Sequence, residues 1–263
     1  MTDPKSVLIT GAGSGIGRDL TIEAVRLGYA PLIVGRTWSS LEETAQMAGS
    51  DKVAILTADV TRPEDRRRIA EAVGGRLDVL INNAGCLTVG PVGDLDDDAL
   101  ERMVRTNLLA PMALTREMLP ALRVARGRIV NIGSVFGDIA YPYFAAYSAT
   151  KFGLRGFSDA IRRELSGTGV GVTYVAPRAT RTAAEAEFGA LIEPLDMVLD
   201  SAERVATEAW EAIQAGRRES FPRGKERFFV KVQRLFPSLV DRSVGAQARA
   251  ENTLQAIETL RRA

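Results

Sequence analysis

Short apolar runs alternate with longer amphipathic stretches over roughly the first 220 residues of the chain. The runs at 7–9, 32–34 and 79–81 are apolar at every position, without the in-and-out alternation of a half-exposed strand. Strands of this kind are buried on both faces, as in a parallel sheet that helices cover on both sides. The pattern therefore predicts an α/β fold with one doubly wound parallel sheet.

About seven strands are expected. Predicted strands occupy 7–9, 32–34, 53–56, 79–81, 128–132 and 170–175, with a short seventh strand and a turn at 221–225. Helical patterns occupy 41–47, a stretch after Thr61, 96–125 and 144–166. Thr61 is predicted as the N-cap of its helix, with Pro63 in the first turn. This order of strands and helices is typical of a Rossmann-type sheet with helices on both faces.

The pattern changes near residue 222, which divides the chain into a Rossmann-type domain at 1–222 and a helical extension at 223–263. A basic, aromatic helix is predicted at 227–236, ended by Pro237, and one polar, alanine-rich helix closes the chain. Its apolar positions are Phe228, Phe229, Val232, Leu235 and Phe236, and its basic neighbours are Lys225, Arg227, Lys231 and Arg234. This composition suits a membrane surface at 225–236. Packing on the chain's own domain or on another subunit is the favoured interpretation.

Composition excludes several classes of function. The formal net charge is +1, so no nucleic-acid partner is expected. The chain has no histidine, which excludes Ser-His-Asp hydrolysis, Cys-His chemistry and nearly every catalytic zinc site, and no metal site is predicted. The single cysteine, Cys86, fits a reducing compartment. Because the N-terminus does not resemble a signal peptide and no apolar run reaches the ~20 residues of a bilayer span, a cytoplasmic location is expected.

Tyr147 and Lys151 are one helical turn apart, so both side chains are expected on one face of the helix predicted at 144–166. An ammonium group close to a phenol favours the phenolate and lowers the pKa of the tyrosine. In a chain without histidine, such a pair is a candidate general acid and base. Taken alone, the spacing is more typical of a solvent-exposed helix face, so the other motifs decide between the two interpretations.

A glycine-rich segment follows the first predicted strand directly and opens the first helix. Residues 10–17 read TGAGSGIG, a TGxxxGxG pattern that differs from GxGxxG. Glycines permit a tight turn and let a pyrophosphate approach the N–H groups of the helix start, where the helix dipole adds about half a positive charge. We interpret this loop as a dinucleotide site. An ordinary glycine-rich turn is the alternative.

Five motifs together resemble those of the short-chain dehydrogenase/reductase family. They are TGxxxGxG at 10–17, Asn82-Asn83-Ala84-Gly85, Asn107, Ser134 and Tyr147-x-x-x-Lys151, in the order and at the spacing of the family. The resemblance covers residues 5 to about 216. It implies hydride transfer between a nicotinamide dinucleotide and a small-molecule substrate, which interconverts a carbonyl and a primary or secondary alcohol.

The resemblance also implies a catalytic group of four residues. Tyr147 would act as general acid and base, while Ser134 would orient the substrate oxygen. Lys151 would lower the pKa of Tyr147 and bind the nicotinamide ribose. Asn107 would kink its helix and support a proton relay by holding a water that links Lys151 to solvent. Asn82 would support the sheet and the adenine-side wall.

The expected cofactor contacts lie at the ends of the strands. They are Gly11, Ser14, Gly15, Ile16 and Gly17 in the loop, Arg36 after the second strand, Asp59 and Val60 after the third, Asn83, Ala84 and Gly85 after the fourth, Tyr147 and Lys151, and Pro177, Thr180 and Thr182 after the sixth.

Arg36 favours NADP(H) over NAD(H). An NAD site usually carries Asp or Glu at this place for the ribose 2′-OH, whereas Arg accommodates a 2′-phosphate. Here Gly35 takes the place of the acid, and the planar fork of Arg36 suits a phosphate. Thr37 and Ser39 are candidate hydroxyl donors. A solvent-exposed Arg36 is the alternative, and Ser14 stands where many NADP-dependent members have a second basic residue.

The exit of the sixth strand departs from the family pattern, because Arg178 replaces the usual glycine after Pro177. Thr182 has the spacing expected for the carboxamide contact, with Thr180 as the alternative. Arg178 and Arg181 are interpreted as solvated charges in preference to contacts with an anionic substrate. Residues 183–200 are predicted to cover the substrate, and their apolar character favours a hydrophobic one.

Other functions remain as alternatives. An NADP-sensing or scaffold protein without turnover would normally have a damaged Tyr/Lys pair, which is intact here, and an NAD-dependent dehydrogenase of the same family stays open. Epimerases and dehydratases are disfavoured because they are longer and usually carry TGxxGxxG. Enoyl reductases space Tyr and Lys more widely. Family members are commonly oligomers through helices near 100–125 and 145–165, so a homodimer or homotetramer is expected.

Overall fold

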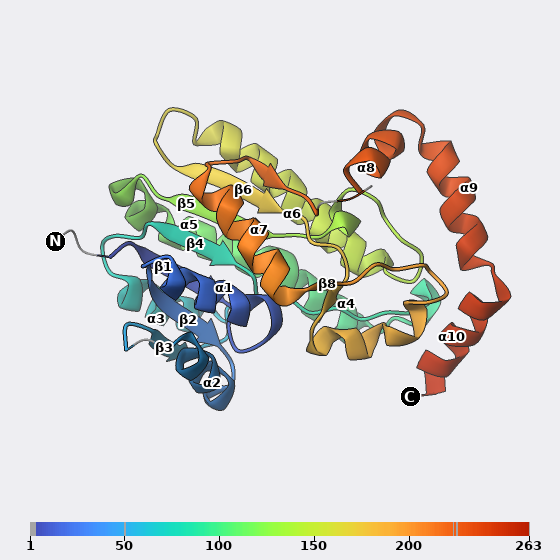
Figure 1. Ribbon diagram of the computed structural model, residues 1–263, viewed down its shortest axis with the longest axis horizontal. Helices are drawn as coiled ribbons and strands as arrows, with labels where there is room; N and C mark the ends of the chain where they lie inside the picture. Colours follow the sequence, from blue (N-terminus) through green and yellow to red (C-terminus); the bar gives the residue numbers. More distant parts are fainter. Residues whose placement is uncertain (1–3, 50, 223, 225, 263) are drawn as a thin grey trace.

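Seven parallel strands form one sheet in the order β3-β2-β1-β4-β5-β6-β9 (Figure 1). The computed structural model describes residues 4–49, 51–222, 224 and 226–262. The strands are β1 (Ser6–Thr10), β2 (Ala30–Gly35), β3 (Ala54–Thr57), β4 (Val79–Asn82), β5 (Arg128–Ile132), β6 (Gly171–Val175) and β9 (Glu219–Ser220). Every neighbouring pair is parallel. The predicted doubly wound fold is confirmed.

Three helices cover each face of this sheet. One layer contains α1 (Gly15–Arg26), α2 (Trp38–Ala48) and α7 (Ala202–Gln214), and the other contains α3 (Pro63–Val73), α5 (Ala110–Ala125) and α6 (Ala145–Glu164). Val7 and Ile9 of β1 pack in the first layer, whereas Leu8 between them packs in the second. Successive side chains of a strand point to opposite faces. Because both faces are covered, all three positions must be apolar.

The long helical stretch predicted at 96–125 consists of three segments. They are α4 (Asp97–Val104), a π-helical turn (Arg105–Leu109) and α5. The predicted N-cap of α3 is wrong, because Arg62 is the N-cap and Pro63 is the first helical residue. Thr61 has another partner, since its hydroxyl donates to Asp59 Oδ1 at 2.7 Å.

The C-terminal extension contains three helices, α8 (Glu226–Leu235), α9 (Pro237–Ala248) and α10 (Glu251–Arg262), which form an arm beside the α/β body (Figure 1). The prediction of one last helix is wrong, because the chain turns after α9, where Thr253 Oγ1 donates to the carbonyl of Gln247 at 2.8 Å. The last strand, β9, ends before the predicted range 221–225, and residues 223 and 225 of that range lie outside the described part of the chain.

The segment predicted to cover the substrate lies between two short paired strands, β7 (Thr180–Arg181) and β8 (Asp200–Ser201). Its buried residues Phe188, Leu191 and Leu195 pack in one cluster with Ile257 of α10. The C-terminal extension therefore packs against the segment at 183–200. Within the ranges described above, no helix has the length and apolar character needed to cross a membrane.

Candidate active site

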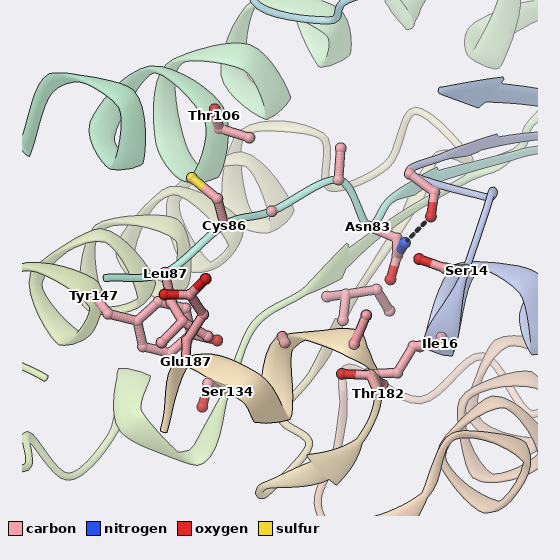
Figure 2. A pocket seen from close by; sticks show the side chains of 18 of the residues that line it. Ser14, Ile16, Asn83, Cys86, Leu87, Thr106, Ser134, Tyr147, Thr182 and Glu187 are labelled. Carbon is pink, nitrogen blue, oxygen red and sulfur yellow. Dashed lines mark hydrogen bonds between the residues drawn. The ribbon is translucent and has the colours of Figure 1, made fainter. Parts of the chain in front are cut away.

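A cavity of about 910 Å³ lies at the carboxyl ends of the central strands. This is the edge where the order of the parallel strands reverses between β1 and β4, the usual ligand position in such sheets. Ser14 and Asn83 lie toward one end of it, and Ser134 and Tyr147 toward the other (Figure 2). All the predicted cofactor residues line the cavity, as do Ser134, Tyr147 and Lys151, whereas Asn107 lies behind its wall.

The glycine loop folds too tightly for any side chain at three of its positions. A Cβ on Gly17 would lie 2.2 Å from the carbonyl oxygen of Gly11, and one on Gly11 would lie 2.8 Å from Ala84 Cα. A Cβ on Gly15 would lie 2.8 Å from Thr182 Cγ2, and Gly11 and Gly15 both have positive φ angles. The glycines therefore keep the backbone at the start of α1 open to the cavity, which fits a pyrophosphate.

Thr10 connects this loop to the turn after β4. Its hydroxyl accepts hydrogen bonds from the N–H groups of Asn83 and Ala84 at 3.0 and 3.1 Å. In return, Asn83 Nδ2 donates to the carbonyls of Thr10 and Gly11 at 2.9 and 3.1 Å. The TGxxxGxG motif begins with Thr10. Its hydrogen bonds to the turn after β4 explain why a hydroxyl is needed at this position.

Arg36 is exposed at the end of β2, lines the cavity, and has no ion-pair partner among the described residues. Thr37 and Ser40 line the cavity beside it, so Ser40 takes the position predicted for Ser39. Asp59 also lines the cavity, but its carboxylate accepts from the N–H and the hydroxyl of Thr61 at 2.9 and 2.7 Å. Arg36 is therefore open to an anionic group.

Arg178 is not the solvated charge that the sequence suggested. Its Nε and Nη2 donate to the two carboxylate oxygens of Asp200 at 2.8 and 2.7 Å, and Asp200 is buried. This bidentate pair holds the exit of β6 against the start of α7. Thr180 points its hydroxyl at the carbonyl of Arg178, 2.9 Å away, while Thr182 lies against Gly15. Arg181 is exposed, as expected.

Asn107 lies in the π-helical turn and is almost fully buried. Its Oδ1 accepts from the N–H of Cys86 at 2.9 Å, and its Nδ2 donates to the carbonyl of Cys86 at 2.7 Å and to Thr150 Oγ1 at 3.2 Å. These bonds join the helix to the turn after β4 and to α6. Single π turns of this kind are frequent at functional sites. The expected irregularity of the helix at Asn107 is therefore present.

Lys151 is buried on the same side of α6 as Tyr147. Its Nζ donates to the carbonyl of Ile132 at 3.0 Å and lies 5.4 Å from the centroid of the Tyr147 ring. A Cβ on Gly85 would lie 3.3 Å from Asn107 Oδ1 and 3.9 Å from Lys151 Nζ, so these two side chains approach the same point. The fold thus brings together residues that are far apart in the chain.

The pKa of Tyr147 is shifted upward, opposite to the lowering expected from Lys151, because burial dominates. Burial raises the pKa of Tyr147 to about 12, opposed by its hydrogen bond with Ser134. Burial also lowers the pKa of Lys151 to about 8. The desolvation of both groups favours their neutral forms, and the ammonium group is directed at the Ile132 carbonyl.

Tyr174 contacts the backbone of both Ser134 and Lys151, although no sequence motif indicates it. It is buried in β6, and its hydroxyl lies 3.3 Å from both the N–H and the carbonyl of Ser134 and 3.4 Å from the carbonyl of Lys151. A Cβ on Gly133 would lie 2.0 Å from the Tyr174 ring, which explains the glycine before Ser134. A buried phenol needs hydrogen-bond partners for its hydroxyl. A tyrosine inside a strand predicted to be buried is therefore the sequence feature that could have indicated this role.

The substrate end of the cavity is largely apolar. It is lined by Leu87, Phe136, Phe144, Phe188 and Met197, and Glu187 also lines the cavity. The rings of Phe136 and Tyr147 meet edge to face at 6.4 Å. Leu191 and Leu195 of the segment at 183–200 pack with α10 and do not line the cavity, so only some of its apolar residues face the cavity.

Curated relatives match most of the Rossmann-type domain. The chain is 38% identical over 182 residues to retinol dehydrogenase 5 of Mus musculus, which covers 67% of this chain and 57% of that protein. It is 38% identical over 180 residues to 11-beta-hydroxysteroid dehydrogenase 1A of Arabidopsis thaliana, which covers 66% of this chain and 51% of that protein. The chain thus spans little more than half the length of these relatives.

Solved structures agree with this comparison. An actinorhodin polyketide ketoreductase variant with NADPH superposes with a TM-score of 0.75 at 27% identity, over 82% of this chain and 94% of that one. A short-chain dehydrogenase/reductase from Burkholderia phymatum in complex with NAD shares the fold, with a TM-score of 0.83 at 21% identity over 91% and 96% of the two chains. The short chain dehydrogenase family model matches residues 5–191. The chain therefore belongs to the short-chain dehydrogenase family.

Proposed function

We propose that this protein is an NADP(H)-dependent oxidoreductase that interconverts a carbonyl compound and an alcohol. The observation that carries the proposal is one continuous cavity with Arg36 near one end and Ser134, Tyr147 and Lys151 near the other. The family relationship supports it, because the relatives described above are named dehydrogenases and a ketoreductase. No group of three or more metal-binding side chains occurs among the described residues.

The dinucleotide would lie along the glycine loop and the ends of the strands. Gly11, Gly15 and Gly17 would face its pyrophosphate, and Asp59 and Val60 would border its adenine. Asn83, Ala84 and Gly85 would line the opposite wall, and Lys151 would bind the nicotinamide ribose. Pro177 and Thr182 would hold the carboxamide, since Thr182 adjoins Gly15 while Thr180 is bonded to Arg178. When bound, the nicotinamide supplies or accepts the hydride.

Tyr147 would move the proton at the substrate oxygen. Its raised pKa keeps the phenol protonated near neutral pH, which suits a general acid during carbonyl reduction. Ser134 would donate a second hydrogen bond to the same oxygen, where negative charge develops. Lys151 would support the proton transfer by Tyr147. Asn107 would fix the position of the turn at Cys86 relative to α6, through its hydrogen bonds to Cys86 and Thr150.

The preference for NADP(H) rests on Arg36. The residue before it is glycine instead of an acid, and the arginine is exposed beside Thr37 and Ser40. A guanidinium binds a phosphate through two parallel hydrogen bonds, whereas a carboxylate at this place would repel it. One structural relative described above carries NADPH and the other NAD, so the preference rests on Arg36 and its surroundings.

The substrate would be apolar around its reacting carbonyl, because aromatic and aliphatic side chains line that end of the cavity. The names of the curated relatives, a retinol and a hydroxysteroid dehydrogenase, refer to substrates of this character. We also propose a homodimer or homotetramer through α5 and α6, where Met112, Val124 and Phe152 are exposed apolar residues.

A titration with NADPH and NADH, followed by a screen of apolar ketones and aldehydes for loss of cofactor absorbance, tests the proposal. We expect tighter binding of NADPH, and Arg36→Glu should reverse the preference. Tyr147→Phe should lower turnover by about 10²–10⁴-fold while cofactor binding is kept. Tyr29→Phe, a change in the core away from the cavity, is the matched control. Cofactor binding without turnover of any carbonyl would instead favour a sensing or scaffold function.

A further inference from the structure

Helix α8 presents its apolar face to solvent. The side chains of Phe228, Phe229, Leu235 and Phe236 are 65%, 48%, 71% and 58% exposed. Among the side chains of this helix that the structure describes, Val230 is the buried one, at 4% exposure. A helix on a soluble protein normally directs its apolar stripe toward the core. Here the stripe is directed away from it.

Helical geometry shows that this face is continuous. At about 100° per residue, positions 228, 229, 232 and 235 of α8 fall within roughly 120° of the helix circumference, and Phe236 follows directly as the N-cap of α9. Val230 lies on the opposite side, and α9 adds the exposed Leu239, at 55%, close to the end of the stripe. Five large apolar side chains at this end of the molecule therefore need a partner to leave water.

Positive charge surrounds the same face. Residues 223–249 contain seven Lys or Arg and two Asp or Glu, a net charge of +5, although the whole chain carries only +1. On α8 itself, Arg227, Lys231 and Arg234 are all exposed at the flank of the apolar stripe, although Arg234 also donates to Asp138 at 2.8 Å and Arg227 lies 3.9 Å from Glu219. An exposed apolar face bordered by basic residues is the pattern of helices that lie in the plane of a membrane interface.

We propose that the face made by Phe228, Phe229, Leu235, Phe236 and Leu239 docks on the surface of a lipid bilayer with anionic headgroups. A second copy of the chain is a poorer occupant. A two-fold contact through this face would bring two segments of net charge +5 together, and like charges repel. Anionic headgroups would instead pair with the basic flank while the aromatic rings enter the apolar boundary.

The docking face is connected to the candidate active site. Arg234 of α8 donates to Asp138 at 2.8 Å, and Asp138 is buried in the turn that follows Ser134. On α9, Gln247 accepts from the Tyr141 hydroxyl at 2.6 Å, and the carbonyl of Ala248 accepts from the Tyr143 hydroxyl at 2.8 Å. The docked arm would thus hold the substrate end of the cavity at the membrane surface.

Vesicle flotation of the full chain tests this docking without reference to enzyme activity. The probes are vesicles of phosphatidylcholine alone and of phosphatidylcholine with about one third phosphatidylglycerol. We expect flotation with the anionic vesicles at low salt and little with the neutral ones. Phe229→Ser/Phe236→Ser should lower the bound fraction at least about tenfold, because two aromatic side chains then no longer leave water on docking. Arg227→Gln/Lys231→Gln should weaken binding and its salt dependence.

The matched control is Met47→Ser/Val92→Ser, which removes two apolar side chains that are 55% and 75% exposed elsewhere on the surface. It should float as the unchanged protein does. Absence of flotation of the unchanged protein at low salt, or equal flotation of Phe229→Ser/Phe236→Ser and the control variant, rejects the proposal. Loss of an oligomer in Phe229→Ser/Phe236→Ser by sedimentation velocity, without lipid binding by the unchanged protein, identifies a second copy as the occupant.

Discussion

Lys151 donates from Nζ to the carbonyl of Ile132 at 3.0 Å and lies in the interior beside the ring of Tyr147. Loss of hydration lowers the pKa of this lysine to about 8 and raises the pKa of Tyr147 to about 12. At neutral pH the phenol is therefore protonated. The protein alone presents a proton donor to the cavity, which is the form that carbonyl reduction requires.

The pH dependence of the two reaction directions should differ. Reduction uses protonated Tyr147, so kcat/KM for a ketone should stay nearly level from about pH 6 to 9, below the raised pKa. Oxidation of the matching alcohol needs the phenolate, so its kcat/KM should rise with pH over the same range, by up to about tenfold per pH unit. Measurement of both directions with one substrate pair checks this, and a reduction rate that increases with pH contradicts it.

The buried lysine should also affect stability. The pKa of Lys151 is about 8 in the folded protein, whereas its ordinary value, expected in the unfolded chain, is 10.5. Between pH 8 and 10.5 the unfolded chain therefore binds more protons than the folded protein, and the stability of the fold rises with pH. Below pH 8 the full cost of burying the charge is present. Lys151→Met removes that cost. The difference in unfolding free energy between Lys151→Met and the unchanged protein should therefore be largest at pH 7, and should shrink by about 2–3 kcal/mol toward pH 10.5.

Chemical unfolding at several pH values between 7 and 10 measures this difference. Lys231→Met, at an exposed position of α8, should show no such trend and serves as the control. An advantage of Lys151→Met that is independent of pH would mean that the lysine is not desolvated as described.

At the scale of elements, the glycine loop and α1 depend on a close approach between Gly17 and the carbonyl of Gly11. Gly17→Ala should lower NADPH affinity at least about tenfold and destabilise the fold by roughly 1–3 kcal/mol, because backbone must shift. Gly156→Ala is the matched change in α6, where a Cβ meets nothing within 4 Å, and it should stabilise by about 0.5–1 kcal/mol. Cofactor fluorescence titration and thermal unfolding measure both effects. Equal behaviour of the two variants would contradict the geometry.

At the scale of the whole molecule, α10 packs on the segment at 183–200 that is proposed to cover the substrate. Ile257, 4% exposed, lies in the cluster of Phe188 and Leu191, while Leu254 on the same helix is 50% exposed. Ile257→Ala should cost about 2–4 kcal/mol locally and release the cover more than the sheet. Hydrogen exchange should therefore speed up in 183–197 and stay slow in β1 and β4. Leu254→Ala is the control, and exchange that rises equally in the sheet would show global destabilisation.

Much of the fold could be predicted because the relevant signals are local. Apolar runs without alternation identified the strands, and the glycine loop, Ser134 and Tyr147 were placed relative to those strands by their motifs. Parallel strands bring their carboxyl ends to one edge, so residues that follow different strands must meet there. This topological constraint is why the predicted cofactor residues all line one cavity.

The remaining features depend on contacts between distant segments. Arg178 pairs with Asp200, 22 residues later in the chain. The hydroxyl of Tyr174 joins the backbone carbonyls of Ser134 and Lys151. The spacing of Tyr147 and Lys151 predicted proximity, but the direction of their pKa shifts follows from burial.

The sequence by itself determined the sheet, the family motifs and the amphipathic character of the last helices, because periodicity and spacing are properties of neighbouring residues. Only the tertiary structure decided which face of α8 turns outward and which carboxylate meets each arginine. It also decided how much water reaches Tyr147. Hydration and ion pairing depend on which surfaces meet, and that information is distributed over the whole chain.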